Sequence, residues 1–192
     1  MTPTHKPTQH GVGGHRDTVV VGTPPVWDNP DGVHSVFIAP SAVLDQMWLW
    51  ANGLVDPQTL DLSQMGRWEV YCPLSELDAW WRVVSSATEA GHLGPASRCG
   101  TAVPQLAHPH SALRTIGVYT YDRDDHADIT IILKRLRGLG INWMVSYQIY
   151  DHRQHPQGRT LWVAEAGSGE PREPTIAGLS SIPWAPNDKA GC

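Results

Sequence analysis

The sequence predicts an α+β domain in which two or three helices pack on one face of a single sheet. Residues 115–121 are β-branched or aromatic except for one glycine, which is typical of a strand. An amphipathic helix and a second strand at residues 143–150 follow directly. Another strand–helix–strand unit starts at Gly66. Strands and helices in this mixture indicate an α+β fold.

The helix of the later unit carries clear start and stop signals. Asp122, Asp124 and Asp125 precede it, and their carboxylates can accept hydrogen bonds from first-turn N–H groups. Gly138 and Gly140 are expected to end the helix. Its apolar residues recur at helical spacing on one face: Ile129, Ile132, Leu133 and Leu136.

The earlier unit has the same plan. A strand at residues 67–72 leads into a helix whose start resembles a capping box formed by Ser75 and Asp78. Gly91 is suited to end this helix, and a strand at residues 97–103 is expected to follow. The helix presents one stripe toward the core: Leu77, Trp80, Trp81, Val84 and Thr88.

Other segments complete the predicted domain. Ser41 is expected to cap a helix over residues 42–52, and residues 159–164 predict one more strand. Stretches near both ends are rich in Pro and Gly and have no hydrophobic period. We therefore predict a loosely attached arm at residues 1–22, one α+β domain at residues 23–178 and a flexible tail at residues 179–192.

Charge, hydropathy and motif content exclude several classes of function. The net charge is -5 although Lys and Arg total 14, which argues against strong binding to duplex nucleic acid. The sequence contains no apolar run of about 18 residues, so it predicts no membrane span. The cysteines are odd in number and scattered, so we expect reduced thiols and a cytoplasmic protein. No glycine-rich nucleotide-binding motif is present, so we predict no cofactor. His108 and His110 have no acidic or cysteine partner at a spacing typical of metal ligands, so we predict no metal site.

Two stretches resemble the conserved blocks of a known family. They are GRWEVYCPLSELDAWWRVVSSATEAGHLGPASRCGT and TIGVYTYDRDDHADITIILKRLRGLGINWMVSYQ. Both are similar to blocks of the family of the basophilic-leukaemia-expressed protein. The resemblance, which covers residues 66–162, implies a fold like that of translation initiation factor 4E: a curved, mainly antiparallel sheet with helices across its convex back. Bacterial members are often labelled phosphothreonine lyases, so the resemblance also implies a bacterial protein with lyase-like chemistry.

The lyase label implies particular catalytic residues. Eliminating phosphate requires a base, an acid and cations that hold the phosphate. By the resemblance, Arg98 stands where the lyases have a basic lysine, Glu69 where they have a histidine, and Gln148 where relatives carry another lysine. Arginine stays protonated in proteins, so Arg98 is a poor base that can still bind an anion. The candidate catalytic residues of such an altered site are Glu69, Arg98, Gln148 and Tyr119.

Arginines and tryptophans supply the candidate binding groups. The candidate ligand-binding residues are Arg67, Arg114, Arg159, Trp48, Trp68 and Trp143. The arginines lie at or near predicted strand starts, where they either converge on a phosphate or carboxylate or stand apart as rim charges. Each tryptophan offers a stacking face, and core packing is the alternative. Alternation along a strand places Arg67 and Trp68 on opposite faces.

Two functional hypotheses follow. The first is a binding module with the 4E-like fold that recognises an anionic ligand, namely a nucleotide, an RNA end or a phosphorylated peptide. The second is a peptide-modifying enzyme of a bacterial biosynthetic pathway, lyase-like or otherwise, with an altered active site. Neither hypothesis includes a membrane partner, and a homodimer is left open. A surface with a facing tryptophan pair favours the first, and a cleft holding Glu69, Arg98, Gln148 and a histidine favours the second.

Overall fold

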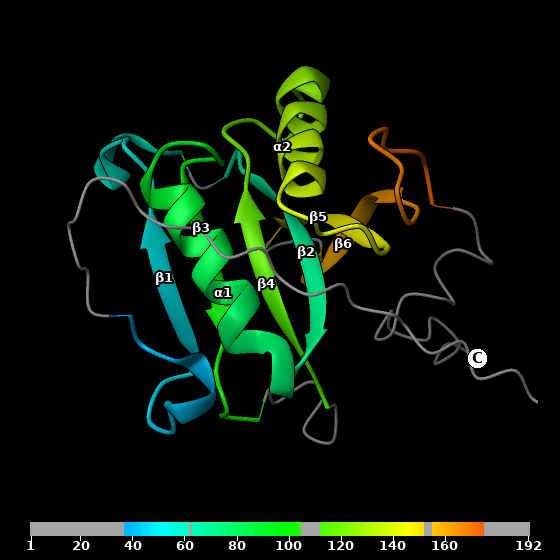
Figure 1. The fold of residues 1–192 in the computed structure, drawn as a ribbon. Coiled ribbons are helices and arrows are strands. Elements are labelled where there is room, and N and C mark those ends of the chain that lie inside the picture. Colours follow the sequence, from blue (N-terminus) through cyan, green and yellow to red (C-terminus); the bar gives the residue numbers. More distant parts are fainter. Residues whose placement is uncertain (1–36, 62, 105–111, 152–154, 175–192) are drawn as a thin grey trace, which may run out of the picture.

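The computed structural model describes residues 37–61, 63–104, 112–151 and 155–174, and it has an α+β fold (Figure 1). Six strands form one curved sheet in the order β1-β3-β4-β2-β5-β6, and every neighbouring pair is antiparallel. The strands are β1 (Trp48–Asn52), β2 (Gly66–Pro73), β3 (Ala96–Gly100), β4 (Leu113–Tyr119), β5 (Val145–Asp151) and β6 (His155–Ala164). The helices are α1 (Leu74–Glu89) and α2 (His126–Gly138), with short 3-10 turns at Pro40–Ala42 and Pro57–Thr59.

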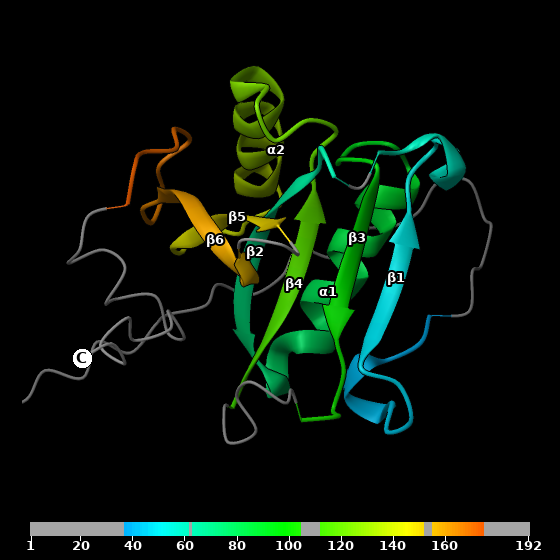
Figure 2. The same ribbon diagram turned by 180° about the vertical axis from the view of Figure 1, so that it is seen from behind.

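Both helices cover the same face of the sheet. In Figure 1, α1 lies in front of β1, β3 and β4, and α2 lies beside it toward β2 and β5. Figure 2 shows the opposite face, which no described helix covers, and there β5 and β6 curl forward toward that face. The predicted α+β class, with its helices on one face of a curved antiparallel sheet, is therefore confirmed.

Aromatic residues fill the core between the helices and the sheet. Trp68 is fully buried, donates its indole N–H to the carbonyl of Ile129 in α2 at 3.0 Å, and packs edge-on against Tyr147 at 5.2 Å. Trp80 of α1 packs edge-on against Trp143, which is also buried, with ring centroids 4.9 Å apart. Core packing is thus the role that this structure supports for Trp68 and Trp143.

The helix predicted at residues 42–52 is wrong, because the segment contains a 3-10 turn and then strand β1. In β1, Leu49 and Ala51 are buried, whereas Trp48 and Trp50 point to the uncovered face. Short apolar runs fit helical and strand periods equally well, so periodicity alone could not distinguish them. The third helix that the sequence allowed is absent from the described residues.

The capping box predicted at Ser75 is also wrong. Helix α1 starts at Leu74, its N-cap residue is Pro73, and no side chain caps it. Asp78 instead accepts hydrogen bonds from the backbone N–H and the hydroxyl of Ser41, at 2.8 Å and 2.5 Å. These bonds tie the segment that precedes β1 to the outside of α1.

The signals predicted for α2 are confirmed. Asp125 is its N-cap residue, and its carboxylate accepts hydrogen bonds from the N–H groups of Ala127 and Asp128 at 2.9 Å and 3.2 Å. Gly140, just after the helix, has a φ of 93°, a conformation that favours glycine. The four predicted apolar residues of α2 are all buried.

Several predictions fall on residues that the structure does not describe. The arm at residues 1–22, the tail at residues 179–192, and His108 and His110 all lie outside the described residues. Within the described part of the chain, neither helix has the length and apolar character needed to cross a bilayer.

Candidate functional site

The strand register aligns chemically distinctive residues in rows on the uncovered face. One row runs across four strands, because Trp50 pairs with Arg98, Arg98 with Gly117, and Gly117 with Glu69. Directly opposite residues of an antiparallel pair project from the same face, so this row lies on one surface.

A second row lies beside the first. Arg67 pairs with Tyr119 on one side and with Gln148 on the other. The predicted alternation is confirmed, since Trp68 packs under α2 while Arg67 lies on the uncovered face with Glu69.

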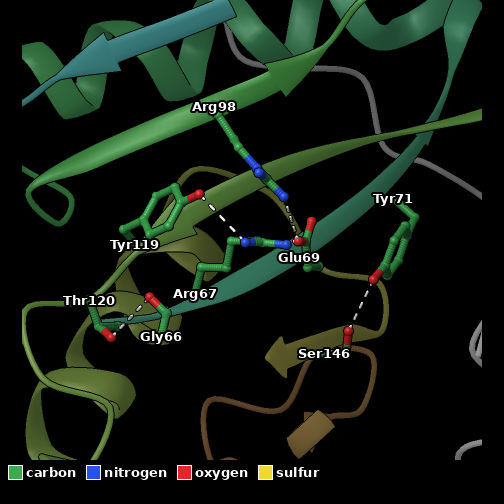
Figure 3. A network of polar contacts seen from close by, with 8 residues as sticks. All are labelled: Gly66, Arg67, Glu69, Tyr71, Arg98, Tyr119, Thr120 and Ser146. Atoms are coloured by element: carbon green, nitrogen blue, oxygen red, sulfur yellow. Dashed lines mark hydrogen bonds and ion pairs between the residues drawn. The ribbon is translucent and has the colours of Figure 1, made fainter. Parts of the chain in front are cut away.

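Two arginines from separate strands meet at one carboxylate. The Nε of Arg67 donates a hydrogen bond to Glu69 Oε1, and the Nη2 of Arg98 lies 3.6 Å from the same oxygen (Figure 3). Arg67 Nη1 also donates to the Tyr119 hydroxyl at 3.5 Å. We call Arg67, Glu69 and Arg98 the arginine–glutamate cluster. Its formation brings together three of the residues singled out from the sequence.

This cluster is unusually buried for three charged side chains on one face. Arg67 is 3% exposed and Glu69 is 2% exposed, whereas the Arg98 side chain retains 15%. Gln148, at 3%, is equally buried. Removing charges from water is costly unless they are paired, and even a well-paired buried cluster adds little net stability. Stability alone is therefore a weak explanation for its presence.

Two buried acceptors next to the cluster receive no hydrogen bond from the described residues. They are the second carboxylate oxygen of Glu69 and the side-chain oxygen of Gln148. Buried polar atoms are nearly always hydrogen-bonded in folded proteins. Acceptors of this kind are expected where a further molecule completes the contacts.

Gly117 provides the space in which the arginines lie. A Cβ atom at this position would lie 3.0 Å from Cδ of Arg67, 3.3 Å from its Nε and 3.4 Å from Cγ of Arg98. A side chain at this position would therefore displace Arg67 and press against Arg98. The glycine that interrupts the predicted β-branched strand therefore has a specific role in the site.

Aromatic rings border the cluster on the β1 side. The guanidinium carbon of Arg98 lies 4.0 Å from the centre of the Trp48 ring, and that of Arg67 lies 5.6 Å from the Tyr119 ring. Trp50, which is 55% exposed, stacks on Tyr119 with centroids 5.7 Å apart and an interplanar angle of 21°. Cations over aromatic faces are held by the ring quadrupole, so these rings orient the guanidinium groups.

The buried end of the site contains residues that sequence reasoning missed. Ser146 pairs with Glu69 across β2 and β5, and its hydroxyl is 3.2 Å from the hydroxyl of Tyr71 (Figure 3). Alternation along β2 could have placed Tyr71 on the same face as Arg67 and Glu69. Ser146 and Gly117 could be found only from the strand register.

Two predicted binding arginines lie elsewhere. Arg114 is buried and donates hydrogen bonds to the carbonyls of Thr101, Leu113 and Ala102 at 2.8, 3.0 and 3.4 Å, which is a structural role. Arg159 is exposed and pairs with Ile149, whose side chain packs against the core, so Arg159 lies on the helix-covered face.

The two arrangements that would separate the hypotheses are described only in part. Trp48 and Trp50 lie side by side on one strand and do not face each other across a ligand space. Glu69 contacts Arg67 and Arg98, and the predicted loop histidines are outside the described residues.

The described residues also include unreactive cysteines and no metal-ligand cluster. Cys72 and Cys99 are buried and form no disulfide. Burial raises the pKa of the Cys72 thiol to about 12 and raises the pKa of Cys99 further, so both are protonated at neutral pH. Within the described ranges, no group of three His, Cys, Asp or Glu side chains is placed to hold a metal ion.

Comparison with known proteins supports the family resemblance. Residues 62–154 match the family model described as basophilic leukemia-expressed protein Bles03. A search of the curated proteins found no match. The matched segment contains the whole arginine–glutamate cluster together with Gly117, Tyr119 and Gln148, whereas β1 and its tryptophans precede it.

Proposed function

We propose that this protein, which shares a segment with the basophilic leukemia-expressed family, is a binding module for an anionic ligand. The ligand is a nucleotide, an RNA end or a phosphorylated peptide, and it binds on the uncovered face of the sheet at Arg98 and Arg67. One observation carries the proposal. Two arginines from separate strands converge beside an aromatic pair, Trp50 and Tyr119, of which Trp50 is exposed.

Guanidinium chemistry supports an oxyanion as the ligand. Arginine presents planar, forked N–H donors that match the geometry of phosphate and carboxylate groups, and it is always charged at physiological pH. Arg98 is the arginine that an incoming anion reaches first, because its side chain is more exposed than that of Arg67. The Trp48 ring, 4.0 Å from the guanidinium carbon of Arg98, helps to hold this cation in place.

The exposed ring of Trp50 supports a ligand that also carries a flat group. One face of this ring stacks on Tyr119, and more than half of the residue remains accessible. A base or another planar group that stacks on such a ring gains about 1–3 kcal/mol. A curved antiparallel sheet with two helices on one face is consistent with a 4E-like fold, which is part of the same proposal.

A lyase-like enzyme is the alternative, and the cluster itself favours it less. Glu69 receives a hydrogen bond from Arg67 and a second guanidinium contact from Arg98. Both contacts are made by the carboxylate oxygen Oε1, whereas a general base must lie within hydrogen-bond reach of the substrate proton that it takes up. Release of inorganic phosphate from phosphothreonine peptides would favour the enzyme.

A cytoplasmic setting also belongs to the proposal. Cys72 and Cys99 are free and buried, as is usual for proteins that fold in a reducing compartment.

The test is a binding screen by calorimetry and thermal shift with nucleotides, short RNAs and phosphopeptides. For any ligand that binds, Arg98→Ala is expected to weaken affinity by at least about tenfold, because hydrogen bonds to charged groups contribute roughly 1.5–3 kcal/mol. Arg159→Ala is the matched control, since it removes the same charge from the helix-covered face. Equal affinity in the wild type and Arg98→Ala would refute the site.

A further inference from the structure

We propose that Glu69 tunes the charge specificity of this site by reducing its preference for doubly charged oxyanions over singly charged ones of the same shape. The inference rests on the proposed anion-binding role of Arg98. It assigns Glu69 to specificity and not to catalysis.

The two arginines differ in how they contact Glu69. Arg67 donates a direct hydrogen bond to Oε1, and its side chain is 4% exposed. Arg98 approaches the same oxygen only to 3.6 Å, and its side chain is 15% exposed. Arg67 therefore holds the carboxylate in place, and Arg98 is the cation that an entering anion can contact.

Glu69 cannot withdraw when an anion binds. Its side chain is buried and hydrogen-bonded to Arg67, and its backbone lies in the central strand β2 between β4 and β5. An anion on Arg98 is consequently a near neighbour of a fixed negative charge.

The strength of this effect follows from Coulomb's law. An anion on Arg98 and the Glu69 carboxylate, about 5 Å apart in a partly buried site, repel each other enough to weaken binding roughly a hundredfold. Salt screens this repulsion and reduces its effect on the binding constant to about tenfold. Every extra negative charge on the ligand incurs this repulsion from Glu69 while it also gains attraction to the arginines. The carboxylate thus reduces the advantage that a doubly charged ligand would otherwise have.

The ligand class that Glu69 favours is a phosphodiester or a carboxylate, each with one negative charge. A phosphomonoester loses its second proton at a pH of about 6 and carries close to two charges above that pH. Among the ligands proposed above, Glu69 therefore shifts the balance toward a phosphodiester within a nucleic-acid strand or dinucleotide and away from a terminal phosphate.

The test uses three small probes with the same ring: methyl phenyl phosphate, phenyl phosphate and benzoate. Each is titrated by calorimetry into the full chain at pH 8, where phenyl phosphate carries two charges and the others carry one. The quantity measured is the ratio of the affinity for phenyl phosphate to the affinity for methyl phenyl phosphate, which repulsion from Glu69 is expected to lower about tenfold in the wild type. The better of methyl phenyl phosphate and benzoate identifies the phosphodiester or the carboxylate as the natural group.

Glu69→Gln is expected to raise this ratio about tenfold. The amide keeps an oxygen acceptor for Arg67, and its NH₂ group replaces an oxygen that accepts no hydrogen bond from the described residues. The repulsion that acts on the second charge of phenyl phosphate is then absent. Glu89→Gln, at the exposed end of α1, changes the net charge equally and should leave the ratio unchanged.

Loss of the buried carboxylate can prevent folding, because Arg67 and Arg98 would then face each other without it. The double variant Arg67→Gln/Glu69→Gln removes one charge of each sign and provides a second test of the same ratio. An affinity ratio that is the same in the wild type and in Glu69→Gln overturns the role of Glu69 but leaves anion binding intact. Failure of all three probes and of every ligand in the screen overturns both proposals.

Discussion

Gly117→Ala tests whether the arginines must lie where the structure places them. The new Cβ atom would be 3.0 Å from Cδ of Arg67, a distance that real Cβ contacts essentially never fall below. It would also be 3.3 Å from Nε of Arg67 and 3.4 Å from Cγ of Arg98. The Arg67 side chain must therefore move by some tenths of an ångström, so that its hydrogen bond to Glu69 lengthens or tilts, whereas Arg98 stays in van der Waals contact with the new methyl group.

Two opposing effects set the magnitude for stability. Overpacking in a tightly packed site costs typically 1–3 kcal/mol. Replacing glycine by alanine in a strand offsets this by about 0.5–1 kcal/mol, because the unfolded chain loses freedom. We expect a net loss of roughly 0.5–2 kcal/mol in the free energy of unfolding, measured by urea denaturation. Anion affinity should fall by more than this, at least about tenfold, because the arginine donors lose their alignment.

Gly138→Ala is the matched control for this substitution. It lies at the end of α2, its φ is not in the left-handed region, and a Cβ atom there would meet nothing within 4 Å. The same change should leave stability equal or up to about 1 kcal/mol higher, with ligand affinity unchanged. If Gly117→Ala is as stable as the wild type and binds anions equally well, the placement of the arginines is not as described.

Three further predictions concern stability and reactivity. Arg137→Ala should lower the free energy of unfolding, measured in urea, by about 3 kcal/mol or more, because the guanidinium holds the segment after α2 against the end of β6. It donates hydrogen bonds to five backbone carbonyls, those of Ile141, Trp143, Ala164, Glu165 and Ser168. In a Cys192→Ser variant, no thiol should react with Ellman's reagent at pH 8 until denaturant is added, because burial raises the pKa of the two remaining cysteines, Cys72 and Cys99. Rapid labelling of the native protein would contradict this. Burial raises the pKa of Asp128 in the folded state, so its favourable contribution is complete below the unfolded pKa of 3.8 and is lost as pH rises through the folded value. Asp128→Asn, which keeps an acceptor for the N–H of Tyr121, should therefore be more stable relative to wild type at pH 7 than at pH 3.5 in thermal unfolding, and an unchanged difference would refute the shift.

Local signals explain which parts of the fold were predicted correctly. Asp125 caps α2, Gly140 follows its end, and the apolar residues of α2 face the core as their spacing requires. These features depend on contacts within a few residues along the chain, so the sequence contains them directly. The same holds for the separation of Arg67 from Trp68, which follows from alternation in any strand.

The segment that became β1 shows where local reasoning fails. Its apolar residues satisfy a helical stripe and a strand alternation equally well, and pairing with β3 decided between them. That pairing joins residues about 50 positions apart, which no local pattern encodes. Trp48 was recognised as a candidate aromatic residue, but its place on a sheet edge was not.

The candidate site likewise combines features that the sequence predicted with features that only the tertiary structure shows. Sequence and family resemblance identified Glu69, Arg98, Gln148 and Tyr119 by residue type, and alternation put Arg67 and Glu69 on one face. Only the order of the strands brought Arg98 across Gly117 to Glu69 and left Arg114 and Arg159 outside. Strand order depends on long-range hydrogen bonding and burial, which many sequences of the same local pattern satisfy differently. The residue types and the faces that they occupy could therefore be predicted from the sequence. The convergence of two arginines on one buried carboxylate could not, because it depends on the tertiary structure.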